Sequence, residues 1–250
     1  IVGNNLIATW LDSELMLARM ASIDLDDKFI EGPSRSDLRI QKSLATALHP
    51  AGNLWSRVLN SQPLALATDG QRVALVLWQS GIYCLNPDSS EIWRSPPPVW
   101  SEVSNMPRSD ETVSMNFHGS ELHIWCAAGG RLVLDADDGT ILRSEKVELD
   151  TVIENVYRDS KHELVCGNNG EAFHLCDNTL RLQTDITGPI QNAIWDSESD
   201  AWRISGWRKE VLLKDQPTVN QFDEIPMHCL NIDGQWWNLF NDGSWKLSNL

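Results

Sequence analysis

Residues 76–87 read VLWQSGIYCLNP in one-letter code, and this phrase of strand, turn and strand returns along most of the chain. Turns of the same kind recur at Gly81, Gly130 and Gly170, a spacing of about 40 to 50 residues. The other copies read HIWCAAGGRLVLDA (123–136), ELVCGNNGEAFHLCD (163–177), RISGWRKEVLLKD (203–215) and WNLFNDGSWKLS (237–248). Short strands repeated at this period predict an all-β repeat fold.

The clearest single repeat covers residues 110–147 and predicts four strands joined by three short turns. Its predicted strands are 111–117, 122–127, 131–134 and 140–143, and residues 65–94 follow the same plan. Four such strands make one blade of a β-propeller. We therefore predict a single β-propeller domain over residues 1–250, with about six four-stranded blades. Rings of five or seven blades are the alternatives.

The two ends of the chain complete this prediction. Residues 226–250 contain three predicted strands, and an N-terminal strand at Ile1–Ala8 is expected to supply the fourth and to close the ring. Such closure removes an open sheet edge that would favour aggregation. Residues 6–60 are the least regular part, and Ser43–Leu48 is either a helical turn or a poor strand.

One stretch resembles a known family. Residues 81–93 read GIYCLNPDSSEIW, which is similar to the repeat of quinoprotein-like (PQQ/WD40-type) propellers, with Ser90 where that repeat has glycine. The next copy keeps residues 134–142, LDADDGTIL, but has Arg143 in place of the closing Trp93. The resemblance extends over about residues 52–147. It implies a propeller fold, and it does not imply an enzyme, because the repeat motif is structural in that family.

The charge of the chain restricts its partners. The 250 residues carry a formal net charge of −15, and no local basic patch interrupts it. This charge disfavours nucleic acid and anionic membrane surfaces and favours a protein partner with a basic face. No apolar run is long enough to span a membrane. Ile1–Asn5 lacks the pattern of a secretion signal, so we expect a cytoplasmic protein, although a segment upstream of Ile1 could be missing.

The five cysteines indicate buried thiols. Cys84, Cys126 and Cys166 sit in apolar strands, and none of the five has the spacing of a zinc site. Reduced thiols in the core are the expectation. A Cys166–Cys176 disulfide across one hairpin is the alternative.

Tryptophan is abundant, with 12 in the chain, and the repeats sort it into two groups. Trp55, Trp78, Trp93 and Trp125 recur at matching places, so we expect them to pack between sheets. Trp100, Trp207 and Trp237 fall in or beside turns, where an exposed indole favours binding. A proline-stiffened insertion at residues 94–108 also favours partner docking, with a passive linker as the alternative. The candidate partner-binding residues are Arg94, Trp100, Met106, Arg108, Trp207 and Trp237.

No catalytic motif, metal site or cofactor is predicted. The chain has no nucleophile elbow, zinc-protease helix or phosphate-binding glycine loop, and its six histidines do not cluster by spacing. Strand histidines His123 and His174 are expected to be hydrogen-bonded structural residues. The sequence therefore favours a non-enzymatic interaction scaffold or subunit of a larger complex. A propeller that binds a small molecule or carbohydrate through exposed tryptophan is the alternative, and a quinoprotein oxidase is the third hypothesis.

Overall fold

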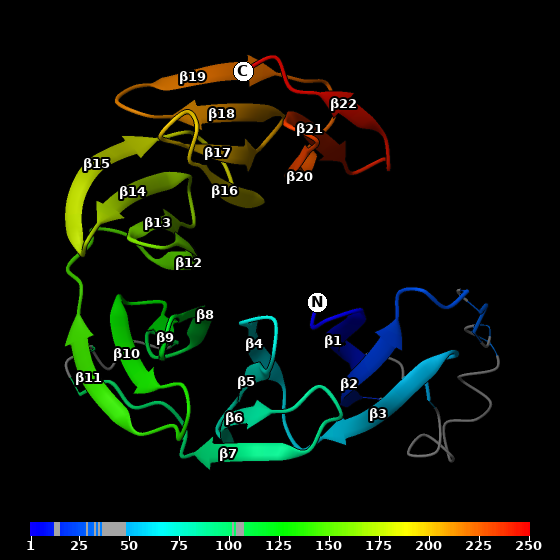
Figure 1. The fold of residues 1–250 in the computed structure, drawn as a ribbon. Helices are drawn as coiled ribbons and strands as arrows, with labels where there is room; N and C mark the ends of the chain where they lie inside the picture. Colours follow the sequence, from blue (N-terminus) through cyan, green and yellow to red (C-terminus); the bar gives the residue numbers. More distant parts are fainter. Residues whose placement is uncertain are drawn as a thin grey trace. The chain divides into compact units, whose positions relative to one another are not determined.

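The computed structural model describes residues 1–12, 16–28, 30–32, 34, 36, 49–101, 103 and 108–250. All 22 elements in these residues are β-strands, and they form six antiparallel sheets in chain order (Figure 1). The predicted all-β fold with about six sheets is confirmed. The segment Ser43–Leu48, expected to be a helical turn or a poor strand, lies outside the described residues.

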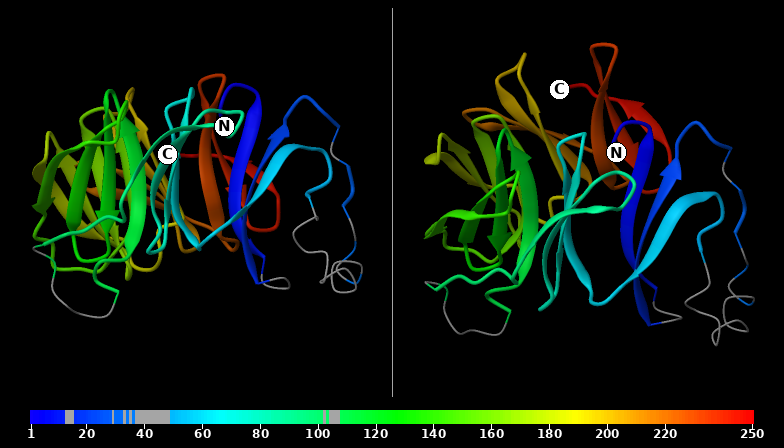
Figure 2. Two further views of the ribbon diagram at one scale, coloured as in Figure 1. Left: turned by 90° about the horizontal axis from the view of Figure 1, so that it is seen from below. Right: turned by 60° about the horizontal axis from the view of Figure 1, so that its bottom comes forward.

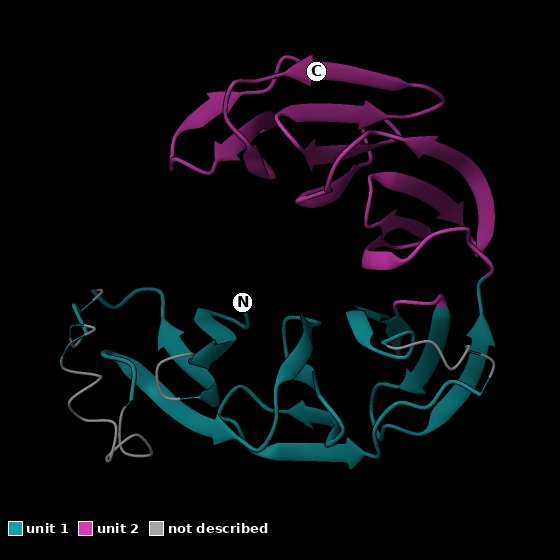
Figure 3. Ribbon diagram, turned by 180° about the vertical axis from the view of Figure 1, so that it is seen from behind, with its two compact units in different colours: residues 1–126, 130–147 teal, residues 127–129, 148–250 magenta. Residues whose placement is uncertain are grey.

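Three sheets belong to a first compact unit, unit 1, which comprises residues 1–126 and 130–147 (Figure 3). Sheet 1 contains β1 (Asn5–Asp12), β2 (Leu17–Asp24) and β3 (Asn53–Leu59). Sheet 2 contains β4 (Pro63–Thr68), β5 (Val73–Leu77), β6 (Gly81–Leu85) and β7 (Glu91–Ser95). Sheet 3 contains β8 (Thr112–His118), β9 (Glu121–Cys126), β10 (Gly130–Asp135) and β11 (Ile141–Lys146).

Three further sheets belong to unit 2, residues 127–129 and 148–250 (Figure 3). Sheet 4 contains β12 (Ile153–Asp159), β13 (His162–Gly167), β14 (Glu171–Cys176) and β15 (Thr179–Asp185). Sheet 5 contains β16 (Asn192–Asp196), β17 (Ala201–Gly206), β18 (Lys209–Leu213) and β19 (Pro217–Gln221). Sheet 6 contains β20 (Pro226–Ile232), β21 (Gln235–Phe240) and β22 (Trp245–Leu247). That the whole chain is a single domain stays a prediction.

The middle strands of the four-stranded sheets are buried on both faces. All five residues of β5 are buried, and so are all six of β17, although successive side chains point to opposite faces. In β5 a continuous apolar run replaces the alternating pattern of a sheet with one wet face, and in β17 even Arg203 and Ser205 are buried. Both faces of these strands must therefore be covered, and within each unit apolar clusters that join neighbouring sheets provide cover. The individual sheets are twisted, as two further views show (Figure 2).

Two tryptophans join successive sheets of unit 1 in the same way. The Trp55 indole Nε1–H in β3 donates to the Pro87 carbonyl oxygen at 2.8 Å. The Trp93 indole Nε1–H in β7 donates to the Ala136 carbonyl oxygen at 2.9 Å. Pro87 and Ala136 occupy equivalent places in the turn after the third strand of sheets 2 and 3. The predicted packing role of Trp55 and Trp93 is confirmed, because each indole binds the turn of the next sheet.

The N-terminal strand does not have the predicted place. β1 pairs along its whole length with β2, from Asn5 opposite Asp24 to Asp12 opposite Leu17, and so begins sheet 1. The prediction that Ile1–Ala8 supplies the fourth strand of the last sheet is wrong. Val2 and Ile7 instead belong to an apolar cluster with Met20 and residues of sheet 2. The apolar side chains of the N-terminus thus stabilise unit 1 itself. Sheets 1 and 6 have three described strands each.

The disulfide alternative is also wrong. All five cysteines are buried and carry free thiols. In the β13–β14 hairpin, Cys166 lies opposite Ala172, and Cys176 lies opposite His162. The two sulfurs therefore sit at opposite ends of the hairpin, where no S–S bond can join them.

Gly139 should be hard to replace, because its turn is held against Trp93. Its φ is +75°, and a Cβ there would lie 2.5 Å from the Trp93 ring. Gly139→Ala should lower the free energy of unfolding by about 3 kcal/mol, from left-handed strain plus overpacking. Gly70→Ala is the matched control, since Gly70 has φ +88° and open space around it, and should cost about 1 kcal/mol. Urea unfolding measures both; equal losses would contradict the packing against Trp93.

Candidate functional site

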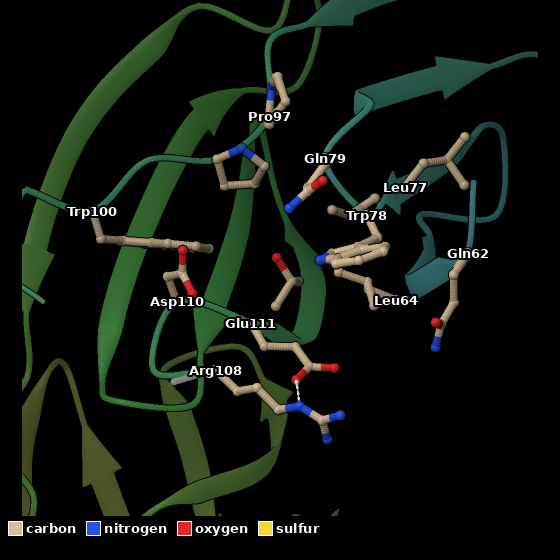
Figure 4. Close-up of a pocket in the computed structure, with 13 residues that line it drawn as sticks. Gln62, Leu64, Leu77, Trp78, Gln79, Pro97, Trp100, Arg108, Asp110 and Glu111 are labelled. Carbon is tan, nitrogen blue, oxygen red and sulfur yellow. Dashed lines mark ion pairs between the residues drawn. The ribbon is translucent and has the colours of Figure 1, made fainter. Parts of the chain in front are cut away.

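A pocket of about 520 Å³ opens in unit 1 where sheets 2 and 3 meet (Figure 4). Its walls come from the start of β4, the end of β5, the proline insertion and the loop before β8. The lining residues are Gln62, Leu64, Val76, Leu77, Trp78, Gln79, Pro97, Pro98, Trp100, Arg108, Asp110, Glu111 and Thr112. The pocket thus combines an apolar floor with polar side chains at the rim, as small-molecule and peptide sites do.

Trp78 is the dominant exposed group of this pocket. Its backbone N–H donates to the Gln62 carbonyl oxygen at 2.8 Å, and its carbonyl oxygen accepts from the Ser61 hydroxyl at 2.6 Å. These two bonds fix the residue at the end of β5, while 53% of its surface stays exposed. The expectation that Trp78 packs between sheets is wrong, because β5 ends at Leu77 and the indole projects beyond the sheet.

The rim of the pocket carries charge of both signs. The Arg108 guanidinium lies 4.0 Å from the Glu111 carboxylate, and Asp110 lies beside them (Figure 4). Arg108 is almost fully exposed, so this ion pair adds little to stability. Its guanidinium is therefore available to a partner. Arg108 and Gln79 both have left-handed backbone, with φ of 62° and 52°, which non-glycine residues adopt mainly in tight turns.

The structure brings two of the predicted binding residues, Trp100 and Arg108, to this pocket. Trp100, however, is only 7% exposed and belongs to the core shared by sheets 2 and 3. Its ring lies against Gly130, where a Cβ would be 2.6 Å from the indole Cδ1. The prediction that Trp100 is an exposed contact is therefore wrong: it forms a wall, and Trp78 offers the exposed indole. Met106 lies outside the described residues.

The other predicted residues lie elsewhere. Arg94 in β7 is exposed, pairs with Glu91 at 2.8 Å, and lines a separate hollow of about 280 Å³. In unit 2, Trp207 is 49% exposed in the β17–β18 turn, as expected. Trp237 was expected beside a turn; it is a half-buried residue inside β21, paired with Leu230 and Leu247. The six candidates therefore do not form one site.

Two histidines of unit 2 come together although their sequence spacing did not indicate it. His162 Nδ1 and His174 Nε2 are 3.0 Å apart, and the His162 ring stacks on Trp195 at 3.6 Å. A hollow of about 400 Å³ beside them is also lined by Lys161, Asp200 and Lys214, among others. The β13–β14 register explains the meeting, because it sets His174 opposite Leu164, two residues from His162. Pairing these two strands as a hairpin could have predicted from the sequence that the two histidines lie close together.

Burial favours the neutral form of both imidazoles. Burial, followed by the neighbouring His162, lowers the pKa of His174 to about 4. Burial and Lys161 lower the pKa of His162 as well, against the opposing effect of Asp200 and other carboxylates. His123 lies in another sheet, where it is buried with its Nε2 2.9 Å from the Glu121 carboxylate. His174 bonds to His162, so the predicted hydrogen-bonded role of both His123 and His174 is confirmed.

Within the described residues, no cluster of three or more His, Cys, Asp or Glu side chains is arranged to hold a metal ion. The described residues likewise contain no helix of the length and apolar character needed to cross a membrane.

Comparisons with known proteins identify the fold. No family model and no curated protein matches the chain. Solved structures do match: BBS1N in complex with ARL6DN, at 10% identity and TM-score 0.63, covers 100% of this chain and 84% of that chain. A protein of unknown function from Bacteroides caccae matches at 11% identity and TM-score 0.60, over 94% of this chain and 81% of its own. The computationally designed Ika8 protein matches at 10% identity and TM-score 0.61, over 99% and 68%.

These likenesses extend over nearly the whole chain, and the matched region consists of consecutive antiparallel sheets. They show that the chain has a β-propeller fold, with the six sheets as its blades. At identities of 10 to 11% they show the fold alone.

Trp100 and Trp78 should respond oppositely to truncation. Trp100→Ala empties a buried site between two sheets and should lower the free energy of unfolding by about 4 kcal/mol. Trp78→Ala removes a side chain that is half in water and should change it by less than about 1 kcal/mol. Chemical unfolding followed by circular dichroism measures both. A larger loss for Trp78→Ala would contradict this division of the two indoles.

The histidine pair should make stability depend on pH. The folded pKa of His174, about 4, lies below its ordinary value of 6.5, so the unfolded chain binds more protons between these values. The free energy of unfolding should therefore fall as pH is lowered from 6.5 toward 4. His174→Gln should flatten this dependence between pH 6.5 and 5, where carboxylates of ordinary pKa remain ionised. Urea unfolding at several pH values measures it, and identical slopes for the two proteins would contradict it.

Proposed function

We propose that the chain is a non-enzymatic β-propeller that binds a protein partner, as an interaction scaffold or a subunit of a larger complex. The observation that carries this proposal is the half-exposed Trp78 indole, whose backbone is fixed by Gln62 and Ser61 beside a pocket. Tryptophan is among the residues most enriched at interface hot spots. A residue already fixed in place loses little conformational entropy on binding.

The surroundings of Trp78 have the composition of an interface. Pro97 and Pro98 line the pocket, and Val99 beside them is largely exposed, which gives an apolar centre. Polar and charged side chains, including Asp110 and Glu111, surround that centre as a rim. Proline fixes φ and stiffens the loop, so the surface is held ready before the partner arrives.

The partner should have a basic face. The chain carries a net charge of −15, and the pocket rim has two carboxylates against one guanidinium. Complementary charge speeds encounter and rejects acidic partners. The match to BBS1N in complex with ARL6DN supports the proposal, because that chain of similar fold was solved with a second protein.

We also propose that the chain is related to quinoprotein-like propellers, because residues 81–93 resemble their repeat. We further propose a cytoplasmic location, which the five buried free thiols support.

Carbohydrate binding is the second candidate function, and the same indole favours it. Aromatic faces stack on sugar rings, and the Gln62, Gln79, Asp110 and Glu111 side chains around Trp78 can bond sugar hydroxyls. A glycan array separates the two candidates. Binding of a defined glycan that Trp78→Ala abolishes, with a matching change in tryptophan fluorescence, would replace the protein-binding proposal.

The proposal predicts retention of a partner through Trp78. The immobilised chain should retain a defined protein from an extract of its own source at low salt, identified by mass spectrometry. Trp78→Ala should reduce its retention at least about tenfold, the loss of a typical hot spot. Raising the salt to about 0.5 M should weaken it as well, because charge steers the encounter.

The matched control is Ile141→Ala, which removes an exposed apolar side chain from β11, away from the pocket, and should leave retention unchanged. Equal retention by the wild type and Trp78→Ala would contradict the proposed surface. A chain that retains no protein at low salt would contradict the function itself.

A further inference from the structure

The pocket between sheets 2 and 3 (the Trp78 pocket) has flat apolar walls. Figure 4 shows Trp100 on one side and Trp78 on the other, the first buried in the core and the second half exposed. Pro97 and Pro98 line the same space. Indole faces offer large and rigid apolar contact areas. The walls therefore suit a ligand that presents rigid apolar rings.

Two side-chain donors of the Trp78 pocket lack an acceptor. Figure 4 shows the nitrogen of the Trp78 ring and the Gln79 amide pointing into the pocket. In the part of the chain that the structure describes, Trp78 makes hydrogen bonds through its backbone alone, and the Gln79 side chain makes none. A donor that a ligand covers loses its water, so the ligand has to supply an acceptor. The two donors therefore favour a ligand with free carbonyl oxygens.

Among peptide conformations, polyproline II meets both requirements. A helix uses its carbonyl oxygens internally, so its backbone has none for the Trp78 indole N–H. An added strand needs a row of free backbone groups, whereas the backbone N–H and C=O of Trp78 already bond Gln62 and Ser61. A polyproline II segment has no internal hydrogen bonds, so its carbonyl oxygens are free, and its proline rings are rigid. Because it is largely ordered before binding, it also loses little entropy.

The charges at the rim add one cation to this ligand. Glu111 has the Arg108 guanidinium 4.0 Å away, whereas the exposed Asp110 forms no ion pair with any described residue. Figure 4 shows Asp110 beside the Trp100 ring. One incoming guanidinium at Asp110 brings the two carboxylates and Arg108 to neutrality, and a second would meet Arg108 as a like charge. Arginine suits the place better than lysine, because its planar group bonds a carboxylate and stacks on an indole.

We propose that the Trp78 pocket binds a polyproline II segment of the partner protein that carries one arginine beside its prolines. The proline rings pack against Trp78 and Trp100, and the backbone carbonyl oxygens accept from the Trp78 indole N–H and the Gln79 amide. The arginine pairs with Asp110. This inference rests on the proposed function, because it names the part of the partner that the pocket holds.

The test uses the blocked peptide Ala-Pro-Pro-Arg-Pro-Pro-Ala and NMR of the nitrogen-15-labelled chain. The Trp78 indole N–H signal is identified by its loss in Trp78→Phe. The peptide should shift this signal downfield and slow its exchange with water, because a carbonyl oxygen then accepts from it. The control peptide Ala-Ala-Ala-Arg-Ala-Ala-Ala has the same length and charge but is not ordered in advance. It should bind at least about tenfold more weakly.

Variants of exposed residues separate the three contacts. Trp78→Phe keeps an aromatic ring without the donor and should weaken binding about fivefold, the effect of one hydrogen bond. Asp110→Asn should weaken binding about threefold, as expected for an exposed ion pair, and should not affect a peptide with glutamine in place of arginine. Asp150→Asn removes an exposed carboxylate in unit 2 and should leave binding unchanged.

The outcomes distinguish this inference from the proposed function. Retention of a protein partner that depends on Trp78, with no response to the proline peptide, would overturn the inference and leave the function standing. Equal binding of the alanine peptide would show that polyproline II is not recognised. Binding that leaves the Trp78 indole signal unchanged would place the peptide elsewhere and overturn the inference as well. A chain that neither retains a partner nor responds to the peptide would contradict both.

Discussion

The burial of the middle strands on both faces is the constraint on which the rest of the structure depends. β5 has no polar residue to present to water, and β17 buries even Arg203 and Ser205, so a lone sheet of this kind could not remain in solution. Strands of this kind need cover on both faces, and within the two units apolar clusters join sheets 1 to 2, 2 to 3 and 4 to 5. Outer strands such as β11 carry polar residues because no sheet lies beyond them.

Tryptophan side chains set the distance between neighbouring sheets that cover each other. A flat, large side chain fills the space between two twisted sheets, and its Nε1–H can bond a turn of the neighbour. Trp55 and Trp93 do both, with carbonyl partners at equivalent places in successive sheets. This geometry explains why position 139 is a glycine, because only a residue without Cβ leaves room for the Trp93 ring. The repeat of the sequence is thus a repeat of one inter-sheet contact.

Much of the fold could be predicted from the sequence because strand and turn signals are local. The alternating and apolar runs around Gly81, Gly130 and Gly170 mark hairpins that the structure confirms. Local sequence does not determine which sheet the N-terminal strand joins. An apolar residue such as Ile7 could pack in any open sheet with an apolar face, and in the structure it packs with Met20 of sheet 1. A pattern of apolar residues indicates that a strand must pack against another element, but it does not indicate which element.

The site was harder to predict, because exposure depends on where a strand stops. Trp78 and Trp125 look equivalent in sequence, yet Trp125 lies inside β9 and Trp78 lies one residue beyond β5. That single step separates a fully buried indole from one that is half in water. Trp100 shows the reverse, since a loop residue folds into the core over Gly130. Composition alone therefore could not separate binding from packing tryptophans.

The surfaces left for function follow from the same architecture. A fold whose core strands are covered by neighbours and by a polar outer strand has few apolar groups to offer, and they appear where the repeat is broken. The Trp78 pocket lies at the insertion between sheets 2 and 3, where the chain departs from the regular repeat. This departure exposes an indole, whereas Trp125 at the matching place in sheet 3 is buried. Irregularity in a repeat protein is therefore the physical reason to look for binding at this pocket.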